Sequence, residues 1–464
     1  MGGTPLRLLR LSAAATVVVS QWNGGAQVGD RPAAGRLARR LVSSGIALPR
    51  PGTTTTFSPR DVTVVIPVRD RPEQLQRLLS ALAGLACIVV DDASADSPRT
   101  AETARRAGAK FIGLATNGGP SVARNAGAAE ATTPLVAFVD SDCVPSTGWL
   151  SPLLGYFDDP LVAAVAPRIV PAPASTSSSL FRYERVRSSL DRGEAAALVR
   201  PRSRVPYVPS AALIIRRNVV ALPFFDPDLR GGEDVDLIWR LVEAGWDVRY
   251  DPASTVAHEG PRTVPSWLRR LAFYGSTAGP LARRHPGALA PLETSVWTAA
   301  VWGLALRRRP VLAAGTLGVS ALVLGRRLHG LVDRPLYAAS RITAGGAAKS
   351  ALPALGGLAR AWSPALVLGL ASRRTRRVAV CALLAPAVSD WITDPGELDA
   401  GRYGALHVAD DVAYGIGLWL GCVRARTVQP LLPRIVLRSG IWSRRSLFTQ
   451  LGGARREEGA GRLR

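Results

Sequence analysis

The sequence predicts an α/β fold in which a Rossmann-like, mixed but mostly parallel sheet carries helices on both faces. Between residues 62 and 258, β-branched runs typical of strands buried on both faces alternate with amphipathic helical segments. Several of these runs end in acidic residues. We expect three parts: a small N-terminal appendage at 1–57, the α/β domain at 58–262, and an Arg-rich helical region at 263–464.

The N-terminal appendage begins with an apolar run that ends near residue 20. Residues 33–45 have the apolar spacing of an amphipathic helix, and a Pro-Gly-Thr linker follows at 51–56. Because no clear small-residue cleavage site follows the apolar run, we do not expect a signal peptide. Two interpretations of this part stay open, a docking appendage and a module that recognises a peptide.

The central region has the pattern of successive strand–helix pairs. Strands are predicted at 62–68, 87–90, 111–115, 135–139, 161–170, 207–216 and 246–250. Helices are predicted at 72–82, 97–108, after the Gly-Gly pair at 118–119, at 147–157, and from Glu233 to Gly245. Residues 171–206 are rich in Ser, Pro and Arg with weak periodicity, so we expect a substrate-facing insertion or a mobile loop.

The apolar run 135–139 ends abruptly in Asp140-Ser141-Asp142. Side chains two residues apart leave a strand on the same face, so both carboxylates point the same way. Hard oxygen ligands without a neighbouring CxxC pair favour Mg²⁺ or Mn²⁺, and such an ion commonly shares its shell with substrate phosphates. The alternative is an ordinary strand-end turn, because Asp and Ser are common turn residues.

Two further segments end at the same predicted edge of the sheet, where ligands of doubly wound folds bind. Asp91 and Asp92 follow a buried run and can accept hydrogen bonds from a nucleobase or a ribose hydroxyl. A Gly-Gly pair ending at Gly119 opens a helix, which would let backbone N–H groups approach phosphate. Arg124 and Asn125 lie in the first turns of that helix.

Carboxylates also cluster at the start of the last predicted helix of the domain. Glu233 and Asp234 there suit the helix dipole, so capping explains them fully. The functional alternative makes one of them a general base that deprotonates an acceptor hydroxyl. His258 lies just past the last strand, where it could complete a metal shell, although a lone histidine is more often structural.

Charge is spread unevenly along the chain, whose net charge is +23. Residues 260–464 contain 29 Lys and Arg against 10 Asp and Glu, whereas residues 1–259 contain 29 against 25. Such a basic region is typical of binding to nucleic acid or anionic lipid, or of plain solvation. We expect a membrane surface and no nucleic acid. The four cysteines are scattered without CxxC spacing, which argues against structural zinc and fits a reducing compartment.

Apolar blocks recur between arginine clusters in the C-terminal third, at 295–306, 310–325, 363–372 and 378–389. Each is about 10–16 residues long, whereas a membrane span needs about 20. We therefore expect surface-lying or re-entrant helices at the cytoplasmic face of the membrane, with 310–328 as a candidate single span and at most one or two spans in all. A buried helical domain is the alternative.

Five motifs occur in one order across residues 62–258: Val65–Val68, Val90–Ser94, Asn117–Gly127, Phe138–Asp142 and Gly232–Asp236. As an ordered set they resemble family 2 glycosyltransferases with the GT-A fold. The resemblance implies a metal-dependent, inverting transfer of a sugar from a nucleotide-sugar donor. It implies that Asp91 and Asp92 hold uridine, that Asp142 leads metal binding, and that Asp234 is the catalytic base.

Carried over residue by residue, the resemblance defines a complete candidate site. Donor-binding residues are Pro67, Asp91, Asp92, Gly119, Arg124, Asn125 and Asp140. Ligands of a divalent metal, Mg²⁺ or Mn²⁺, are Asp140, Asp142 and His258. Trp149, Glu233 and Asp236 are assigned to the acceptor side.

Three longer stretches, 190–193, 200–212 and 268–275, are similar to the glycosyltransferases of mycofactocin systems. Those enzymes are thought to add β-linked glucose to a peptide-derived redox cofactor, which implies UDP-glucose as donor and a peptide-derived acceptor. Their N-terminal part resembles a peptide-binding PqqD-like module, which residues 1–57 match only partly. A polyprenyl phosphate or other lipid acceptor stays open. A degenerate membrane scaffold also stays open, although Asp92, Asp142 and Asp234 together argue against it.

Overall fold

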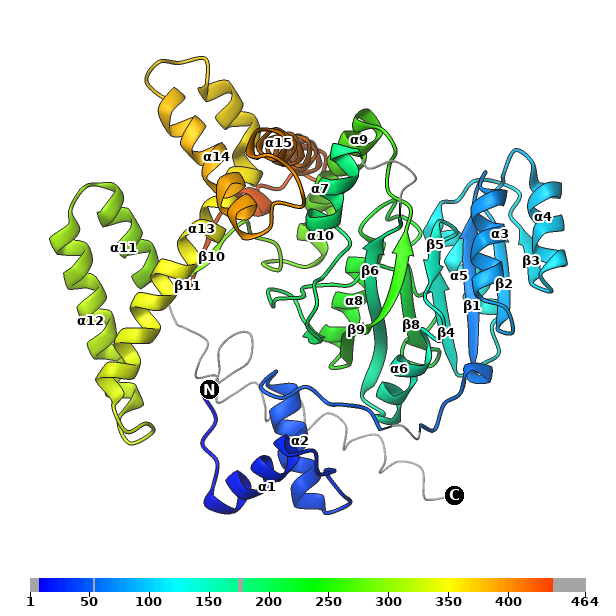
Figure 1. Cartoon of the computed structure of the whole chain (residues 1–464), viewed down its shortest axis with the longest axis horizontal. Helices are drawn as coiled ribbons and strands as arrows, with labels where there is room; N and C mark the ends of the chain where they lie inside the picture. The colour runs from blue at the N-terminus through cyan, green and yellow to red at the C-terminus, as the bar shows by residue number, and fades with distance from the viewer. Residues whose placement is uncertain (1–7, 53–54, 174–177, 437–464) are drawn as a thin grey trace. The chain divides into compact units, whose positions relative to one another are not determined.

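A mixed sheet of nine strands organises the larger of two compact units in this computed structural model, which describes residues 8–52, 55–173 and 178–436 (Figure 1). The larger unit comprises residues 48–292 and 352–433, and the smaller one the described parts of 1–47, 293–351 and 434–464. The predicted α/β fold is confirmed.

The strand order across the sheet is β3-β2-β1-β4-β8-β6-β9-β5, with β7 also pairing β9. The strands are β1 (Val62–Val68), β2 (Ala86–Asp91), β3 (Lys110–Gly113), β4 (Leu135–Val139), β5 (Cys143–Pro145), β6 (Val162–Pro171), β7 (Ala197–Val199), β8 (Ala212–Arg216) and β9 (Asp247–His258). Strands β3, β2, β1 and β4 are parallel, as are β6 and β9. The pairings of β8, β5 and β7 with their neighbours are antiparallel.

Alternate residues of the central strands supply two separate hydrophobic cores, one on each face of the sheet. On β1, Val64 and Ile66 belong to a core that includes Leu75 and Leu78 of α3 (Pro72–Ala81). Val65, between them, belongs to the other core, with residues of α5 (Pro120–Glu130) and α8 (Glu233–Glu243). The β1 side chains are buried on both faces, which is why the sequence shows a continuous apolar run instead of alternation.

Several predicted elements differ from the observed ones in length or kind. The predicted helix 147–157 is only α6 (Ser151–Leu154) followed by a 3₁₀ turn, Gly155–Asp158. The predicted strand 207–216 is limited to β8, and the predicted helix 97–108 is α4 (Ser97–Arg106). Conversely, β9 continues to His258, because β6 and β5 supply ladder partners that the local sequence cannot reveal.

The insertion predicted as a loop at 171–206 contains regular structure. Helix α7 (Ser179–Arg187) is capped by Ser178, whose side chain accepts a hydrogen bond from the Phe181 N–H. Strand β7 then pairs with β9. The prediction of a loop without regular structure was wrong here, because tertiary contacts and not local periodicity stabilise α7 and β7.

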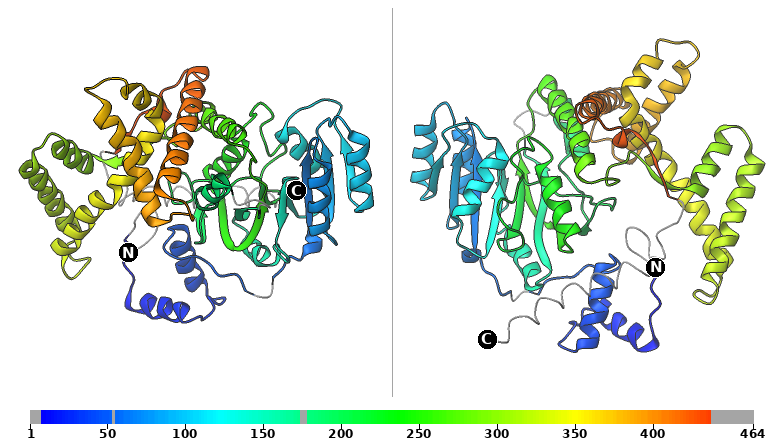
Figure 2. Two further views of the ribbon diagram at one scale, coloured as in Figure 1. Left: turned by 45° about the horizontal axis from the view of Figure 1, so that its top comes forward. Right: turned by 180° about the vertical axis from the view of Figure 1, so that it is seen from behind.

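C-terminal helices complete the larger unit: α9 (Val264–Ser276), α10 (Ala278–Arg284), the end of α13 (Pro335–Gly369), α14 (Arg376–Thr393) and α15 (Ala400–Arg424). Helix α15 packs on α9, and Figure 2 shows the two side by side. Glycines allow this close approach: a Cβ on Gly417 would lie 1.8 Å from the Ala272 carbonyl oxygen. A Cβ on Gly421 would lie 2.2 Å from the Ser276 carbonyl oxygen.

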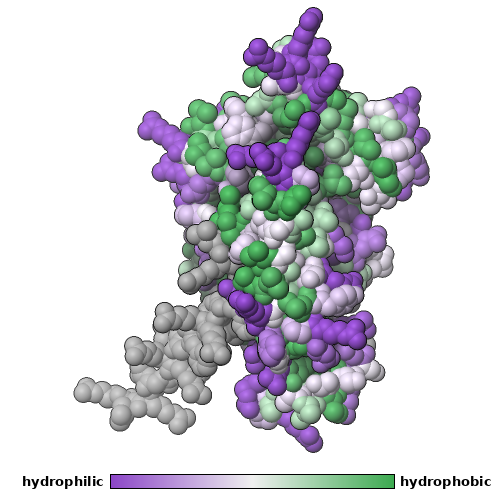
Figure 3. All heavy atoms as spheres, turned by 90° about the vertical axis from the view of Figure 1, so that its left-hand side faces the viewer, coloured by the Kyte–Doolittle hydropathy of each residue, from purple (hydrophilic) through white to green (hydrophobic). Residues whose placement is uncertain are grey.

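The smaller unit contains α1 (Ala13–Asn23), α2 (Pro32–Ser43), α11 (Val296–Leu306), α12 (Pro310–Leu328), the first part of α13, and the parallel strands β10 (Glu293–Ser295) and β11 (Arg434–Val436). Of the described helices, α12 and α13 are long and apolar enough to cross a membrane. Leu306 and Val311 are more than four-fifths exposed. Figure 3, a view of one face of the protein, shows apolar side chains between hydrophilic ones. Helices α12, α13 and α14 extend beyond the predicted apolar blocks.

We predict that Gly417→Ala destabilises the protein, because the added methyl group cannot fit against the α9 backbone. Such overpacking costs about 1–3 kcal/mol. Gly404→Ala is the matched control: it lies on the same helix with nothing within 4 Å of its Cβ, so it should stabilise by about 0.5–1 kcal/mol. Urea unfolding should give a lower free energy of unfolding than the wild type for Gly417→Ala and a higher one for Gly404→Ala. Equal changes in the two variants would contradict the packing argument.

Candidate active site

The acidic strand ends predicted to converge do lie at one edge of the sheet. Strands β2, β1 and β4 are parallel neighbours, so their carboxyl ends share that edge. The Asp92 N–H donates to the Val68 carbonyl at 2.9 Å, which joins the ends of β2 and β1. Pro67 is buried on β1, opposite Val90.

Asp91 and Asp92 have different surroundings. The Asp91 carboxylate is fully buried and accepts a hydrogen bond from the Ser94 hydroxyl. The two oxygens of Asp92 accept the backbone N–H groups of Gly118 and Gly119, at 2.8 and 2.9 Å. Asp92 therefore holds the glycine pair in place, and these two N–H groups are already engaged instead of being free for phosphate as predicted.

The glycine pair ends at the start of α5 in a conformation that other residues rarely adopt. Gly119 has φ 86° and precedes the first residue of the helix. A Cβ on Gly118 would lie 2.8 Å from the Val122 side chain. The segment therefore needs glycine at both positions, which brings α5 close to the ends of β1 and β2.

Arg124, on α5, is the centre of the site. Its guanidinium is buried and donates to Asp140 Oδ1 at 2.6 Å and to Glu233 Oε1 at 2.9 Å. Burial alone would lower the pKa of Arg124, but the two carboxylates outweigh this effect and raise it. Arg124 thus links the end of β4 to the start of α8 with its charge intact.

The neighbours of Asp140 shift its pKa in opposite directions. Burial raises the pKa of its carboxyl group, the Arg124 charge lowers it, and the negative charge of Asp142 raises it again; the net direction is upward. A bound cation would favour the ionised form of both carboxylates.

Asn125 points to a different part of the protein. Its side-chain amide donates to the Phe225 carbonyl at 2.6 Å and accepts the Phe225 N–H at 3.0 Å. Both polar groups are therefore used to hold the segment before α8 against α5. This pairing connects the helix with the region of the predicted catalytic base.

Asp142 and His258 come together from neighbouring strands. The pairing of Cys143 with His258 places them side by side, and His258 Nε2 is 3.7 Å from Asp142 Oδ1. Arg71, in the loop after β1, forms an ion pair with the other oxygen of Asp142. In the described residues no three His, Cys, Asp or Glu side chains are grouped closely enough to hold a metal. One carboxylate and one imidazole do fit an ion whose remaining ligands are phosphates and water.

Glu233 and Asp234 begin α8, after Gly232 in the left-handed conformation. Asp234 Oδ2 accepts the Ser210 N–H at 3.4 Å. Part of the Asp234 surface is exposed, yet the surrounding protein raises its pKa to about 6, first by burial and then by repulsion from Glu233. Such a carboxylate is ionised near neutral pH and basic enough to accept a proton.

Two residues predicted on the acceptor side have structural partners. Asp236 is buried, and its oxygens bind Arg240 at 2.8 Å and His285 at 3.0 Å. Trp149 is buried in the core on one face of the sheet, beside Leu150 and Leu153. Glu233, by contrast, lies beside Asp234 and contacts Arg124.

Arg71 was not predicted from the sequence, although it pairs with the predicted metal-binding residue Asp142. Its signal was present, because it follows Val68 by three residues at the strand end that also carries Asp70. Tyr274 was not predicted either. Burial raises the pKa of Tyr274 to about 12, and the residue lies near enough to Asp234 for that negative charge to contribute. No local pattern indicates this position.

Sequence comparison with known proteins assigns the chain to an enzyme class. Residues 63–220 match the model of the family "Glycosyl transferase family 2". The chain is 40% identical, over 94% of its own length and 94% of the relative's, to the pre-mycofactocin glycosyltransferase of Mycobacterium tuberculosis (strain ATCC 25618 / H37Rv). The chain belongs to glycosyltransferase family 2 and is an enzyme of that class.

More distant similarities are also present. An uncharacterized glycosyltransferase of Mycobacterium tuberculosis is 32% identical over 41% of this chain and 85% of its own length. Among solved structures, the mannosyltransferase PcManGT from Pyrobaculum calidifontis, in complex with GDP-Man and Mn²⁺, matches 82% of this chain and 92% of its own. That match has 18% identity and a TM-score of 0.45, which is too low to support an argument about the site.

Proposed function

We propose that this enzyme transfers glucose from UDP-glucose to pre-mycofactocin, a peptide-derived acceptor, with inversion at the anomeric carbon. The observation that carries the proposal is the 40% identity, over 94% of both chains, to a protein named pre-mycofactocin glycosyltransferase. Similarity over nearly the whole length includes the C-terminal helices, which supports a shared acceptor and not only a shared donor domain.

Asp234 is the proposed general base. With a pKa of about 6 it is mostly ionised at neutral pH, so it can take the proton of the acceptor hydroxyl. The freed oxygen attacks the anomeric carbon and forms the new glycosidic bond. The bond from that carbon to the diphosphate breaks on the opposite side, and UDP leaves with the electron pair. This single displacement inverts the configuration.

The donor half of the site is proposed at the carboxyl ends of β1, β2 and β4. Asp91, beside buried Pro67, would hold uridine. Asp92 would bind uridine together with Asp91 while its carboxylate holds Gly119 in place. Asn125 would contribute by holding the segment before α8 against α5. Arg124 keeps Asp140 oriented toward the ribose or the metal.

A divalent metal, Mg²⁺ or Mn²⁺, fits Asp142 and His258, with Asp140 close by. When bound, it would neutralise the charge that builds up on the departing diphosphate. Arg71 occupies one oxygen of Asp142 and supplies a positive charge at the same place. Glu233 would help to keep Asp234 basic through repulsion, while Trp149 and Asp236 would support the acceptor side from the core.

Mass analysis of the products tests the proposed reaction. The full-length protein, UDP-glucose and the mycofactocin precursor should give a product heavier by one hexose, and Asp234→Asn should reduce turnover by about 10²–10⁴-fold while leaving UDP binding unchanged. Near-normal transfer by Asp234→Asn would place the base elsewhere. A polyprenyl phosphate acceptor belongs in the same assay, because the apolar helices α12 and α13 favour a lipid substrate as second candidate. Glucosylation of that lipid alone would replace the first proposal.

The same reaction should lose activity in mild acid. A base works only when deprotonated, and the pKa of Asp234 is about 6, so the rate at low substrate concentration should be constant above that pH. Below it the rate should fall about tenfold per pH unit. A rate profile from pH 5 to 8 checks the direction, and a rate that rises toward acid would contradict the assignment.

We predict that Asp142→Ala removes the metal dependence of donor binding. Wild-type protein should bind UDP more tightly when Mn²⁺ is present, whereas the variant, which lacks the carboxylate between His258 and Arg71, should bind it equally with and without the ion. Glu102→Ala, an exposed carboxylate on α4, is the control. Titration calorimetry measures UDP binding to both variants with and without Mn²⁺. If Asp142→Ala still bound UDP more tightly with Mn²⁺, the proposed role of Asp142 in metal binding would be refuted.

We further propose that α12 and α13 attach the enzyme to the cytoplasmic face of the membrane. Their length and composition support this, as do Arg326 and Arg327 at the end of α12, which suit anionic headgroups. Full-length protein should sediment with anionic phospholipid vesicles. Recovery of all protein in the supernatant at low salt would contradict membrane association.

A further inference from the structure

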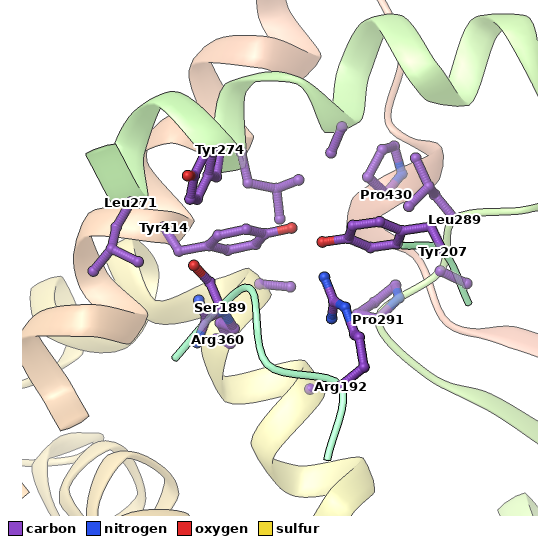
Figure 4. A pocket seen from close by; sticks show the side chains of 15 residues that line it. Ser189, Arg192, Tyr207, Leu271, Tyr274, Leu289, Pro291, Arg360, Tyr414 and Pro430 are labelled. Atoms are coloured by element: carbon purple, nitrogen blue, oxygen red, sulfur yellow. The ribbon is translucent and has the colours of Figure 1, made fainter. Parts of the chain in front are cut away.

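A second feature of the larger unit is a cavity of about 320 Å³ to which the reaction proposed above assigns no role (Figure 4). Three tyrosines, Tyr207, Tyr274 and Tyr414, contribute to its lining together with Arg192 and Arg360. They come from the segment before β8, from α9, from α15, from the insertion and from α13. A volume of this size is near the lower end of the range for small-molecule sites.

The cavity adjoins the proposed base. Tyr207 precedes Ser210 by three residues, so the two Cα atoms are at most about 11 Å apart, and the Ser210 N–H contacts Asp234. On α9, Phe273 packs on the segment before α8, since a Cβ on Gly231 would meet its ring at 2.5 Å, and the next residue, Tyr274, lines the cavity. A ligand in the cavity would therefore lie beside the catalytic centre.

The two arginines of the lining differ in their charge balance. Arg360 donates to Asp410 at 2.8 Å and to Asp411 at 3.0 Å, so neighbouring carboxylates neutralise it. Arg192 has no ion pair among the described residues, and its Nε and Nη2 atoms are buried without hydrogen-bond partners there. Leaving buried donors unsatisfied costs about 1–3 kcal/mol each, more when they are charged, so the cavity is built for an oxygen that accepts from Arg192.

The aromatic lining suits a flat group. The Arg192 guanidinium stacks on Tyr207, 4.0 Å from the ring centroid, and the Arg360 guanidinium stacks on Tyr414 at 4.3 Å. Figure 4 shows the hydroxyl groups of Tyr207 and Tyr414 pointing toward each other across the cavity, with Arg192 beside them. The faces and edges of these rings offer contacts to another ring, worth about 0.5–1.5 kcal/mol per pair.

We propose that this cavity binds the ring-bearing part of the acceptor, and that Arg192 donates hydrogen bonds to a carbonyl or carboxylate oxygen of that part. The inference rests on the proposed glycosyl transfer, since it assigns the acceptor side of the same site. It also favours a compact cyclic acceptor over a lipid phosphate. A phosphate dianion would meet only one cation that lacks a carboxylate partner in the described lining, and three phenol rings would give it no matching charge.

Ligand-observed NMR with the full-length protein and no donor tests the cavity directly. Phenylacetate, which combines a ring with a carboxylate, should bind the wild type, whereas phenethylamine, with the same ring and a positive charge, should not. Inorganic phosphate should not displace phenylacetate. Arg192→Gln should weaken phenylacetate binding at least tenfold, and Tyr207→Phe, which keeps the ring, should retain it. Arg269→Gln, an exposed arginine on α9, is the matched control and should bind like the wild type.

Three outcomes would overturn the proposal: no phenylacetate binding to the wild type, equal binding to Arg192→Gln when that variant is folded by circular dichroism, or displacement by phosphate. In glucosylation assays, Arg192→Gln should raise KM for the acceptor about tenfold and leave KM for the donor unchanged. Because the NMR test needs no turnover, failure of the cavity proposal is separable from failure of the glycosyl transfer, which the product masses report.

Discussion

The contact on which the site depends is the buried guanidinium of Arg124 between Asp140 and Glu233. Asp140 follows β4 on the proposed donor side, and Glu233 begins α8 beside the proposed base, so the Arg124 side chain connects the two halves. Removing one partner of a buried ion pair costs about 3–5 kcal/mol, although the Asp140 side chain is 28% exposed and solvent reduces its share. Asn125, one residue on, adds a second connection to the Phe225 backbone.

Helices α9, α10, α14 and α15, together with the end of α13, belong to the same compact unit as the sheet. Helix α15 approaches α9 so closely that Gly417 and Gly421 contact backbone atoms, and it brings Tyr414 to the cavity. Asp410 and Asp411 on the same helix fix Arg360. Helix α15, which lies outside the apolar blocks predicted from the sequence, therefore lines the cavity near the proposed base.

The strands of the proposed donor half and their acidic ends could be predicted, because their determinants are local. Strands β1 and β4 are found where β-branched runs predict them, at Val62–Val68 and Leu135–Val139. The acidic residues after them meet at one edge because parallel neighbours align their carboxyl ends. The predictions were weaker where partners are distant: β9 is extended by its pairing with β6, and the insertion forms α7 and β7 through contacts that no local period reveals.

The class of enzyme and the position of its acidic strand ends could be predicted from the amino-acid sequence, since burial patterns and motif order are properties of neighbouring residues. The contacts that each side chain makes there are visible only in the folded protein. The structure showed that Asp92 holds the glycine pair, that Asp236 pairs with His285, and that Arg71 faces Asp142. It alone revealed Arg192 without a counter-ion among the described residues, beside Tyr207 and Tyr414. These contacts join side chains that lie far apart in the sequence, so spacing along the chain does not predict them.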